Sequence, residues 1–179
     1  MTDKFNVNMD KDGMYYATAD TKELENKYNE IIKKEFNWKV WQYKGLWCVI
    51  NRHPNLQHLN AYIGLPDKVD IGSHTYEHPW FQYDEGYYDP DYGDLHSFVN
   101  VHGGITWGPQ YTDNGVMSFH IKKKLTWIGF DCGHLGDWTP GSPSGEYRTM
   151  DYVTQECNRV VDDYYETLVD KLKAKITTL

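Results

Sequence analysis

A strand-like apolar run that ends abruptly in polar residues constrains this chain most. Residues 127–130 read Trp-Ile-Gly-Phe and lead directly into Asp131-Cys132-Gly133-His134, and Asp137 follows three residues after the histidine. Two acids and an imidazole among glycines are poor material for a hydrophobic core, because buried charges need partners. The pattern predicts a buried strand that ends in a polar site.

A companion segment lies earlier in the chain, where residues 101–107 read Val-His-Gly-Gly-Ile-Thr-Trp. Two consecutive glycines let a backbone turn sharply or approach a ligand closely, which would place His102 at a strand edge. A hairpin turn with a hydrogen-bonded histidine explains the same residues. If the two segments meet, they form one His/Asp cluster from neighbouring strand ends.

The cluster admits two kinds of role. Neutral imidazole and carboxylate groups are ligands for divalent metals, and a carboxylate can orient a histidine as a general base. Gly133 and Gly136 would let the side chains converge. In the alternative, Asp131 and Asp137 accept backbone N–H bonds and stiffen a loop, with His134 as their partner.

We therefore predict a polar pocket in which a divalent metal is the candidate cofactor. The predicted catalytic and metal-ligating residues are His102, Asp131 and His134. The predicted ligand-binding residues are His58, Asp137, Trp107 and Trp138, with aromatic rings stacking on the ligand. Cys132 could serve as a nucleophile if its pKa were lowered, but its acidic neighbour disfavours the thiolate, so a small buried residue is the favoured interpretation.

The apolar periodicity predicts an α+β fold with a mainly antiparallel sheet and two helices packed on it. One helix is expected at Thr21–Phe36, introduced by a capping box of Asp20 and Glu23. The other, at about Glu146–Lys175, has lysines in its final turns, as the helix dipole favours. The strands are expected around 38–42 and at Leu46–Ile50, Leu59–Leu65, Ser97–Val101, Ile105–Trp107, Val116–Ile121 and Leu125–Asp131.

Length and composition bound the possibilities further. The 179 residues fit one domain, 1–179. A net charge of −8 argues against direct binding to a nucleic-acid backbone, which needs lysine and arginine on phosphates. The three cysteines contain no CxxC pair and fit a reducing cytosol. No apolar run is long enough to predict a membrane span.

Two segments carry little regular pattern. Residues 1–19 are expected to be irregular. Residues 66–96 read as one long loop, in which five acids alternate with tyrosines between positions 83 and 94. A loop of that length in a compact domain is usually functional or mobile. This one could be a lid over a site, a polyanion mimic, or a solvated insert.

Several of these segments resemble a diffuse family of small, uncharacterised proteins encoded by tailed phages and prophages. The matching residues are Gln57-His58 before Ala61-Tyr62-Ile63, then His102–Thr106, Gly129–Asp137, Tyr147-Arg148, Tyr152-Val153 and Glu156-Cys157. The central HGG[LI]T and GFDCxHxGD patterns are the specific part. Gln57 and Ala61 depart from the small glycine usual there, and residues 72–96 are an insert. The resemblance implies expression in the cytoplasm of an infected bacterium, in host takeover or counter-defence, and no particular chemistry.

These observations leave three functional hypotheses. The first is a phage accessory protein whose pocket binds, and with a metal hydrolyses, a small polar or nucleotide-like ligand. The second is a non-catalytic acidic inhibitor that binds a host defence protein as a nucleic-acid mimic. In the third, the motif residues only brace the fold.

Overall fold

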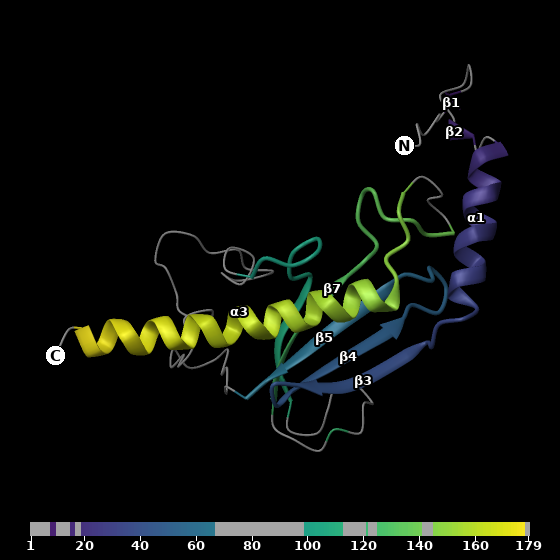
Figure 1. Ribbon diagram of the computed structural model, residues 1–179. Coiled ribbons are helices and arrows are strands. Elements are labelled where there is room, and N and C mark those ends of the chain that lie inside the picture. The colour runs from purple at the N-terminus through teal and green to yellow at the C-terminus, as the bar shows by residue number, and fades with distance from the viewer. Residues whose placement is uncertain are drawn as a thin grey trace.

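The computed structural model describes residues 8–9, 15–16, 19–66, 99–112, 121, 125–140 and 145–177. Its centre is a five-stranded antiparallel sheet in the order β3-β4-β5-β7-β6 (Figure 1). The strands are β3 (Trp38–Tyr43), β4 (Leu46–Arg52), β5 (Leu59–Leu65), β6 (Trp107–Thr112) and β7 (Leu125–Asp131). A 14-residue helix, α1 (Ala19–Ile32), precedes the sheet, and a 28-residue helix, α3 (Met150–Thr177), follows it. The predicted α+β class is confirmed.

The strands alternate between the two faces of the sheet as a period of two requires. In β5, Leu59, Ala61 and Ile63 point toward α3, and the residues between them point to the opposite face. The β3–β4 hairpin closes through Lys44-Gly45, both with positive φ. That geometry is the two-residue turn whose twist matches paired strands. β7 lies inside the sheet and is buried on both faces, which explains its continuous apolar run.

Helix α3 covers one face of the sheet, and its C-terminal half continues past the sheet (Figure 1). The contact is a closely packed core of aliphatic, aromatic and cysteine side chains. From α3 it includes Val153, Cys157, Val160, Val161 and Tyr164, and from the sheet Cys48, Ile50, Ala61, Ile63 and Phe130. All three cysteines are buried and unpaired by disulfides. Burial raises the pKa of the Cys48 thiol to about 12.

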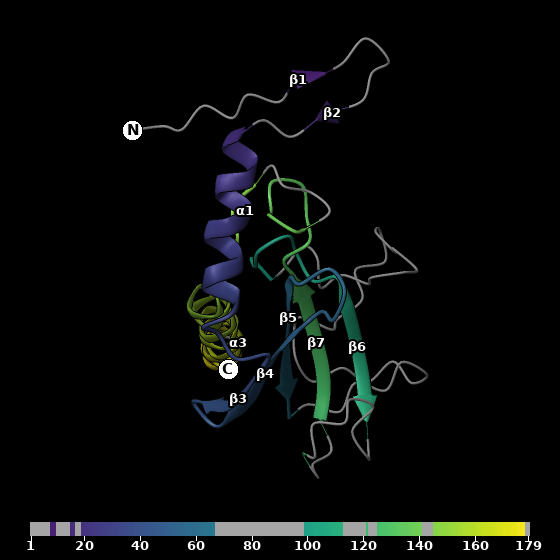
Figure 2. The same ribbon diagram turned by 90° about the vertical axis from the view of Figure 1, so that its right-hand side faces the viewer.

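Helix α1 stands at the end of the sheet near the start of α3 (Figure 2). Its Tyr28 packs against Trp138 and Tyr147. Just after the helix, Glu35 bonds the buried Arg52 guanidinium at 2.8 Å and accepts the backbone N–H of Met150 at 2.7 Å. This carboxylate joins α1, β4 and the first residue of α3, and it makes the two helices and the sheet one unit.

Both helices differ at their ends from the predictions. α1 begins at Ala19, before the expected capping residue Asp20, and ends at Ile32, which leaves Phe36 79% exposed. α3 begins at Met150 rather than Glu146 because the backbone of Glu146 pairs with Gly136 and Trp138. Thr149 caps the helix instead, since its hydroxyl accepts the N–H of Tyr152.

Two predicted strands are wrong in part. The described residues of Ser97–Val101 form no strand, although Val99 and Val101 are buried beneath α3. The strand predicted at Ile105–Trp107 was placed too early in the chain, because β6 starts at Trp107. Apolar residues report burial, and a loop that enters the core shows the same pattern as a strand.

The remaining predictions fall at the margins of the described chain. Most of Val116–Ile121 and all of the acidic segment 83–94 lie outside the described residues. The segment 1–19 was expected to be irregular, but Asn8–Met9 (β1) pairs with Tyr15–Tyr16 (β2). Within the described ranges, no helix is long and apolar enough to cross a membrane.

Candidate functional site

Three loops meet at one end of the sheet, beside the start of α3. They are residues 53–58 between β4 and β5, residues 101–106 before β6, and residues 132–138 after β7. The register pairs Asn60 with Asp131 and Trp107 with Gly129, so all three loops lie at the same end of the strands. The sheet therefore brings the two predicted motifs together.

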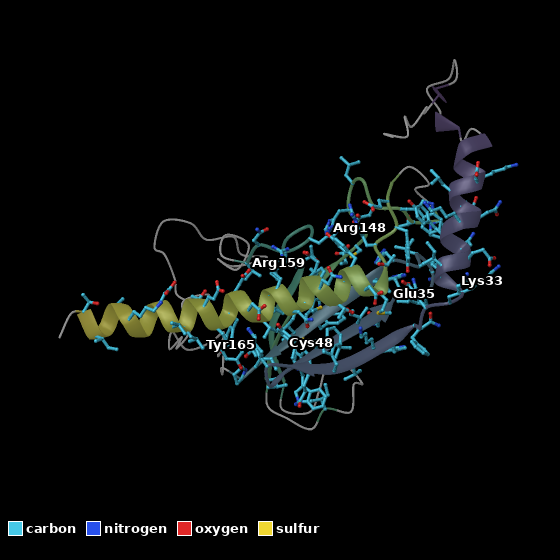
Figure 3. All side chains as sticks on the ribbon, viewed as in Figure 1. Lys33, Glu35, Cys48, Arg148, Arg159 and Tyr165 are labelled. Carbon is cyan, nitrogen blue, oxygen red and sulfur yellow. The ribbon has the colours of Figure 1, made fainter. Side chains whose placement is uncertain are left out.

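The first part of the site is an inner cluster of His102, Asp137, Arg148 and Tyr152. The Nε2 atom of His102 lies 2.7 Å from Oδ2 of Asp137, and its Nδ1 atom lies 3.1 Å from the Tyr152 hydroxyl. Arg148 donates from Nε to Oδ1 of Asp137 at 2.8 Å, and its guanidinium lies over the Tyr152 ring. Figure 3 shows Arg148 above the N-terminal end of α3. The cluster links both motif loops to the helix.

Asp137 is the centre of this cluster, with a side chain only 2% exposed. Burial opposes its ionisation, but hydrogen bonds from Arg148 and His102 outweigh burial and hold its pKa below the usual range. The backbone N–H of His134 adds a further bond at 3.1 Å. An ionised carboxylate only accepts, so His102 donates from Nε2 to Asp137, and its Nδ1 atom is hydrogen-bonded to the Tyr152 hydroxyl.

The Tyr152 hydroxyl keeps its proton at this position. Burial raises the pKa of its hydroxyl, and the charge of Glu156 raises it further, so the proton stays on the oxygen at neutral pH. Glu156 also accepts the backbone N–H of His102 at 2.9 Å. Each side-chain nitrogen and oxygen named here has a hydrogen-bond partner within the cluster. The inner cluster therefore acts as a brace that fixes the two motif loops to α3.

The second part of the site is a rim formed by His58, Asp131 and His134. Asp131 accepts from the Thr106 hydroxyl and from the backbone N–H of Gly133, both at 2.8 Å. Nε2 of His134 lies 3.7 Å from Oδ1 of Asp131, beyond hydrogen-bond distance. These two side chains are about equally accessible, at 31% and 30% exposed.

Three glycines allow rings to lie against the backbone here. A Cβ atom at Gly103 would lie 1.9 Å from Nε2 of His134, and one at Gly133 would lie 2.9 Å from Nδ1 of His58. A Cβ at Gly129 would meet the Tyr62 ring at 2.8 Å. Gly103 also has a φ of +67°, which favours glycine. The glycines of both motifs therefore make room for a ring from another segment.

Among the residues that the structure describes, two ring nitrogens of the rim are buried and have no hydrogen-bond partner. They are Nδ1 of His58 and Nε2 of His134. Burial lowers the pKa of His58, an effect opposed by the charge of Asp131. His58 is consequently neutral at pH 7. A buried polar atom without a partner costs free energy, so this pair distinguishes the rim from the inner cluster.

The geometry bears on the predicted metal site. In the described part of the chain, no three His, Cys, Asp or Glu side chains converge as metal ligands would. His102 directs its nitrogens to Asp137 and Tyr152, while Asp131 faces His134 on the other side. The predicted trio of His102, Asp131 and His134 is thus divided between the inner cluster and the rim, although the two histidine rings lie 5.8 Å apart.

The two predicted tryptophans have different positions. Trp138 is 1% exposed and packs between Tyr28 and Tyr147, so it belongs to the core beneath α1 and not to a ligand surface. Trp107 lies on the sheet face opposite α3, edge-on to Tyr62 at 5.3 Å. Its neighbour Thr106 bonds Asp131, which places Trp107 beside the rim. Cys132 is buried and its pKa is raised by burial, as a core residue's would be.

Arg148, Tyr152 and Glu156 were not among the predicted site residues. Tyr152 and Glu156 are four positions apart on one face of α3, and Arg148 precedes that face by one turn. Polar side chains at this spacing beside buried Val153 and Cys157 were the available signal. No family model, curated protein or solved structure matches the chain.

Proposed function

We propose that this protein binds a small polar ligand at the rim, through Asp131, His134 and His58. The inner cluster holds the rim in place. The observation that carries the proposal is the pair of buried ring nitrogens without partners, one on each side of Asp131. A ligand that donates or accepts at these atoms would supply the missing hydrogen bonds.

The energetic argument is a comparison between bound and free states. Each buried polar atom without a partner costs about 1–3 kcal/mol. Asp131 adds binding capacity, because each carboxylate oxygen has two lone pairs and only one bond to each oxygen is made within the loops. The partly exposed Asp131 carboxylate makes these acceptors reachable from solvent, whereas a ligand would reach the two buried ring nitrogens only if the His58 and His134 rings turned.

Binding is better supported than hydrolysis. Hydrolysis would need an activated water, and the candidate base His102 is bonded at both nitrogens. His134 is the remaining candidate, and within the described ranges the carboxylate that it faces, Asp131, lies 3.7 Å from its Nε2 atom, beyond hydrogen-bond distance. The alternative of an acidic inhibitor depends on residues 83–94, which the structure does not describe.

The resemblance to phage and prophage proteins supplies the biological setting of the proposal. We propose that the chain acts as an accessory protein in the cytoplasm of an infected bacterium, where it sequesters or senses its ligand. The motif residues at 102–106 and 129–137 supply His102 and Asp137 of the inner cluster and Asp131 and His134 of the rim.

The test is a thermal-shift series with adenosine, AMP, ribose, glucose and glucose 6-phosphate at millimolar concentration. We expect one or more to raise the Tm of the wild type and of Asp170→Asn, an exposed carboxylate far from the site. The shift should vanish in Asp131→Asn and His134→Ala. If none raises the Tm, and ¹⁵N resonances of the His58 and His134 rings do not move, the proposal is wrong.

A further inference from the structure

The sheet face opposite α3 continues the rim into a row of amides. Strand register aligns Asn51 of β4, Asn60 of β5 and Asp131 of β7 across neighbouring strands. Nδ2 of Asn60 donates to Oδ1 of Asn51 at 3.2 Å. Both asparagines are half-buried, as is Asp131. The face therefore presents a line of neutral amides that ends in one carboxylate.

An aromatic row lies next to the polar one. Register places Tyr62 opposite Gly129, and Gly129 opposite Trp107. The Tyr62 ring occupies the space a side chain at 129 would fill, and Trp107 packs edge-on against it. Gly129 and Asp131 are two residues apart on one face, roughly 7 Å along the strand. Rings and polar groups at this spacing can contact one small ligand.

The charge of Asp131 also acts on Tyr62. Burial raises the pKa of the Tyr62 hydroxyl, and the negative charge of Asp131 raises it further. The polar and aromatic rows are therefore neighbours in space as well as in register.

The charges around the rim disfavour an anionic ligand. The guanidinium of Arg148 in the inner cluster is already bonded to Asp137 and Glu146. Asp131 faces His134 at 3.7 Å and retains acceptor positions on both oxygens. A phosphate placed there would meet a carboxylate on a chain of net charge −8. Hydroxyl groups, by contrast, donate to carboxylates and amides without a charge penalty.

We infer that the ligand is a neutral ring bearing adjacent hydroxyl groups, either a free sugar or the ribose of a nucleoside. Asp131 accepts the ligand hydroxyls, the Asn51–Asn60 amides bind its remaining oxygens, and Trp107 packs on its apolar face. Aromatic rings suit this last role because they combine an apolar face with a polar edge. The inference rests on the proposed function, since it names the class of ligand for the same rim.

The experiment compares neutral and phosphorylated members of two pairs by isothermal titration calorimetry. Adenosine is matched with AMP, and glucose with glucose 6-phosphate. We expect the neutral member that binds to do so at least tenfold more tightly than its phosphate. Adenosine binding without ribose or glucose binding identifies a nucleoside, and the reverse identifies a free sugar.

Three variants locate the ligand. Asp131→Asn should weaken binding of the neutral ligand about tenfold. It should also reduce the ratio between the affinities of the neutral compound and its phosphate. Trp107→Ala should weaken both members of a pair alike, and Asn60→Ala provides a second, milder test should Trp107→Ala fold poorly. Asp170→Asn should match the wild type.

Two results would overturn the inference, and they differ in what else they overturn. If the phosphates bind as tightly as the neutral compounds and Asp131→Asn removes binding, the ligand class is wrong but the rim site stands. If no compound binds and no rim histidine resonance moves, the proposed function fails as well. Neutral binding that survives both Asp131→Asn and Trp107→Ala would place the ligand elsewhere and also contradict the inference.

Discussion

Asp131 and Asp137 belong to one motif, six residues apart, yet the fold treats them in opposite ways. Asp137 is 2% exposed and is bonded by Arg148, His102 and the backbone of His134. Asp131 is 31% exposed and is bonded by Thr106 and Gly133, with His134 just out of reach. Asp137 accepts three hydrogen bonds and is closed to solvent, whereas Asp131 accepts two and is partly exposed.

The difference separates stability from binding. A buried carboxylate with three hydrogen bonds holds three segments of chain together, and its removal leaves Arg148 bonded to Glu146 alone. A half-exposed carboxylate with free lone pairs contributes little to folding and can serve a ligand. The motif is therefore a brace at one end and a binding group at the other.

The largest effect is expected for Asp137→Ala. The substitution removes the buried acceptor for Arg148, His102 and the His134 amide together. Arg148 keeps its contact with Glu146, so we expect a loss of about 3 kcal/mol, as for hydrogen bonds to a charged group. Urea denaturation should show a reduced free energy of unfolding with an unchanged m-value. A loss no larger than that of Asp131→Ala would contradict the division between brace and rim.

Gly103→Ala should come next, at about 2 kcal/mol. The position has positive φ, and its new Cβ would lie 1.9 Å from the His134 ring. Gly136→Ala is the matched control in the same site, because it has a φ of +93° and nothing within 4 Å of its Cβ. The difference between the two variants measures the His134 contact. Equal losses in both would mean that the ring moves aside freely.

The pH dependence of stability should show two separate windows. His58 has a lowered pKa in the folded chain, so below its ordinary value of 6.5 the unfolded state binds the proton first. The free energy of unfolding should therefore fall as pH drops below 6.5 and level off below the folded-state pKa.

The Asp137 contribution behaves in the corresponding way at lower pH. Its folded-state pKa is below the ordinary 3.8, so its stabilisation is complete above 3.8 and is lost as pH falls through the folded value. His58→Gln should abolish the upper window and leave the lower one in place, as followed by Tm against pH. An upper window that persists in His58→Gln would assign it to another histidine.

The smallest effect on stability is expected for Asp131→Asn, at about 0.5 kcal/mol. The amide oxygen can still accept from Thr106 or Gly133, and little of the side chain's environment is desolvated. Its consequence should instead appear in ligand binding. A stability loss comparable to that of Asp137→Ala, in the same urea titration, would make Asp131 a second brace.

Sequence periodicity located the elements whose burial pattern is simple. β5 and β7 were predicted at the residues where they occur, because each has a regular apolar pattern in the middle of the sheet. The start of α3 was misplaced because Glu146 pairs with residues 136–138, a contact with a distant segment. Val99 and Val101 were predicted in a strand for a related reason, since a buried loop carries the same apolar residues.

The site residues also fall into those that the sequence identified and those that only the fold brought in. His102, Asp131, His134 and Asp137 were identifiable from residue type and glycine spacing alone, because polar groups at the end of an apolar strand need partners or a task. Which of these side chains are held in the inner cluster was decided by Arg148, just before α3, and by Tyr152 and Glu156 on the helix. Local sequence placed Asp131, His134 and Asp137 directly after β7, and the strand register brought His102 beside them. The tertiary structure decided which carboxylate became a brace, because hydrogen-bond saturation depends on side chains from distant parts of the chain.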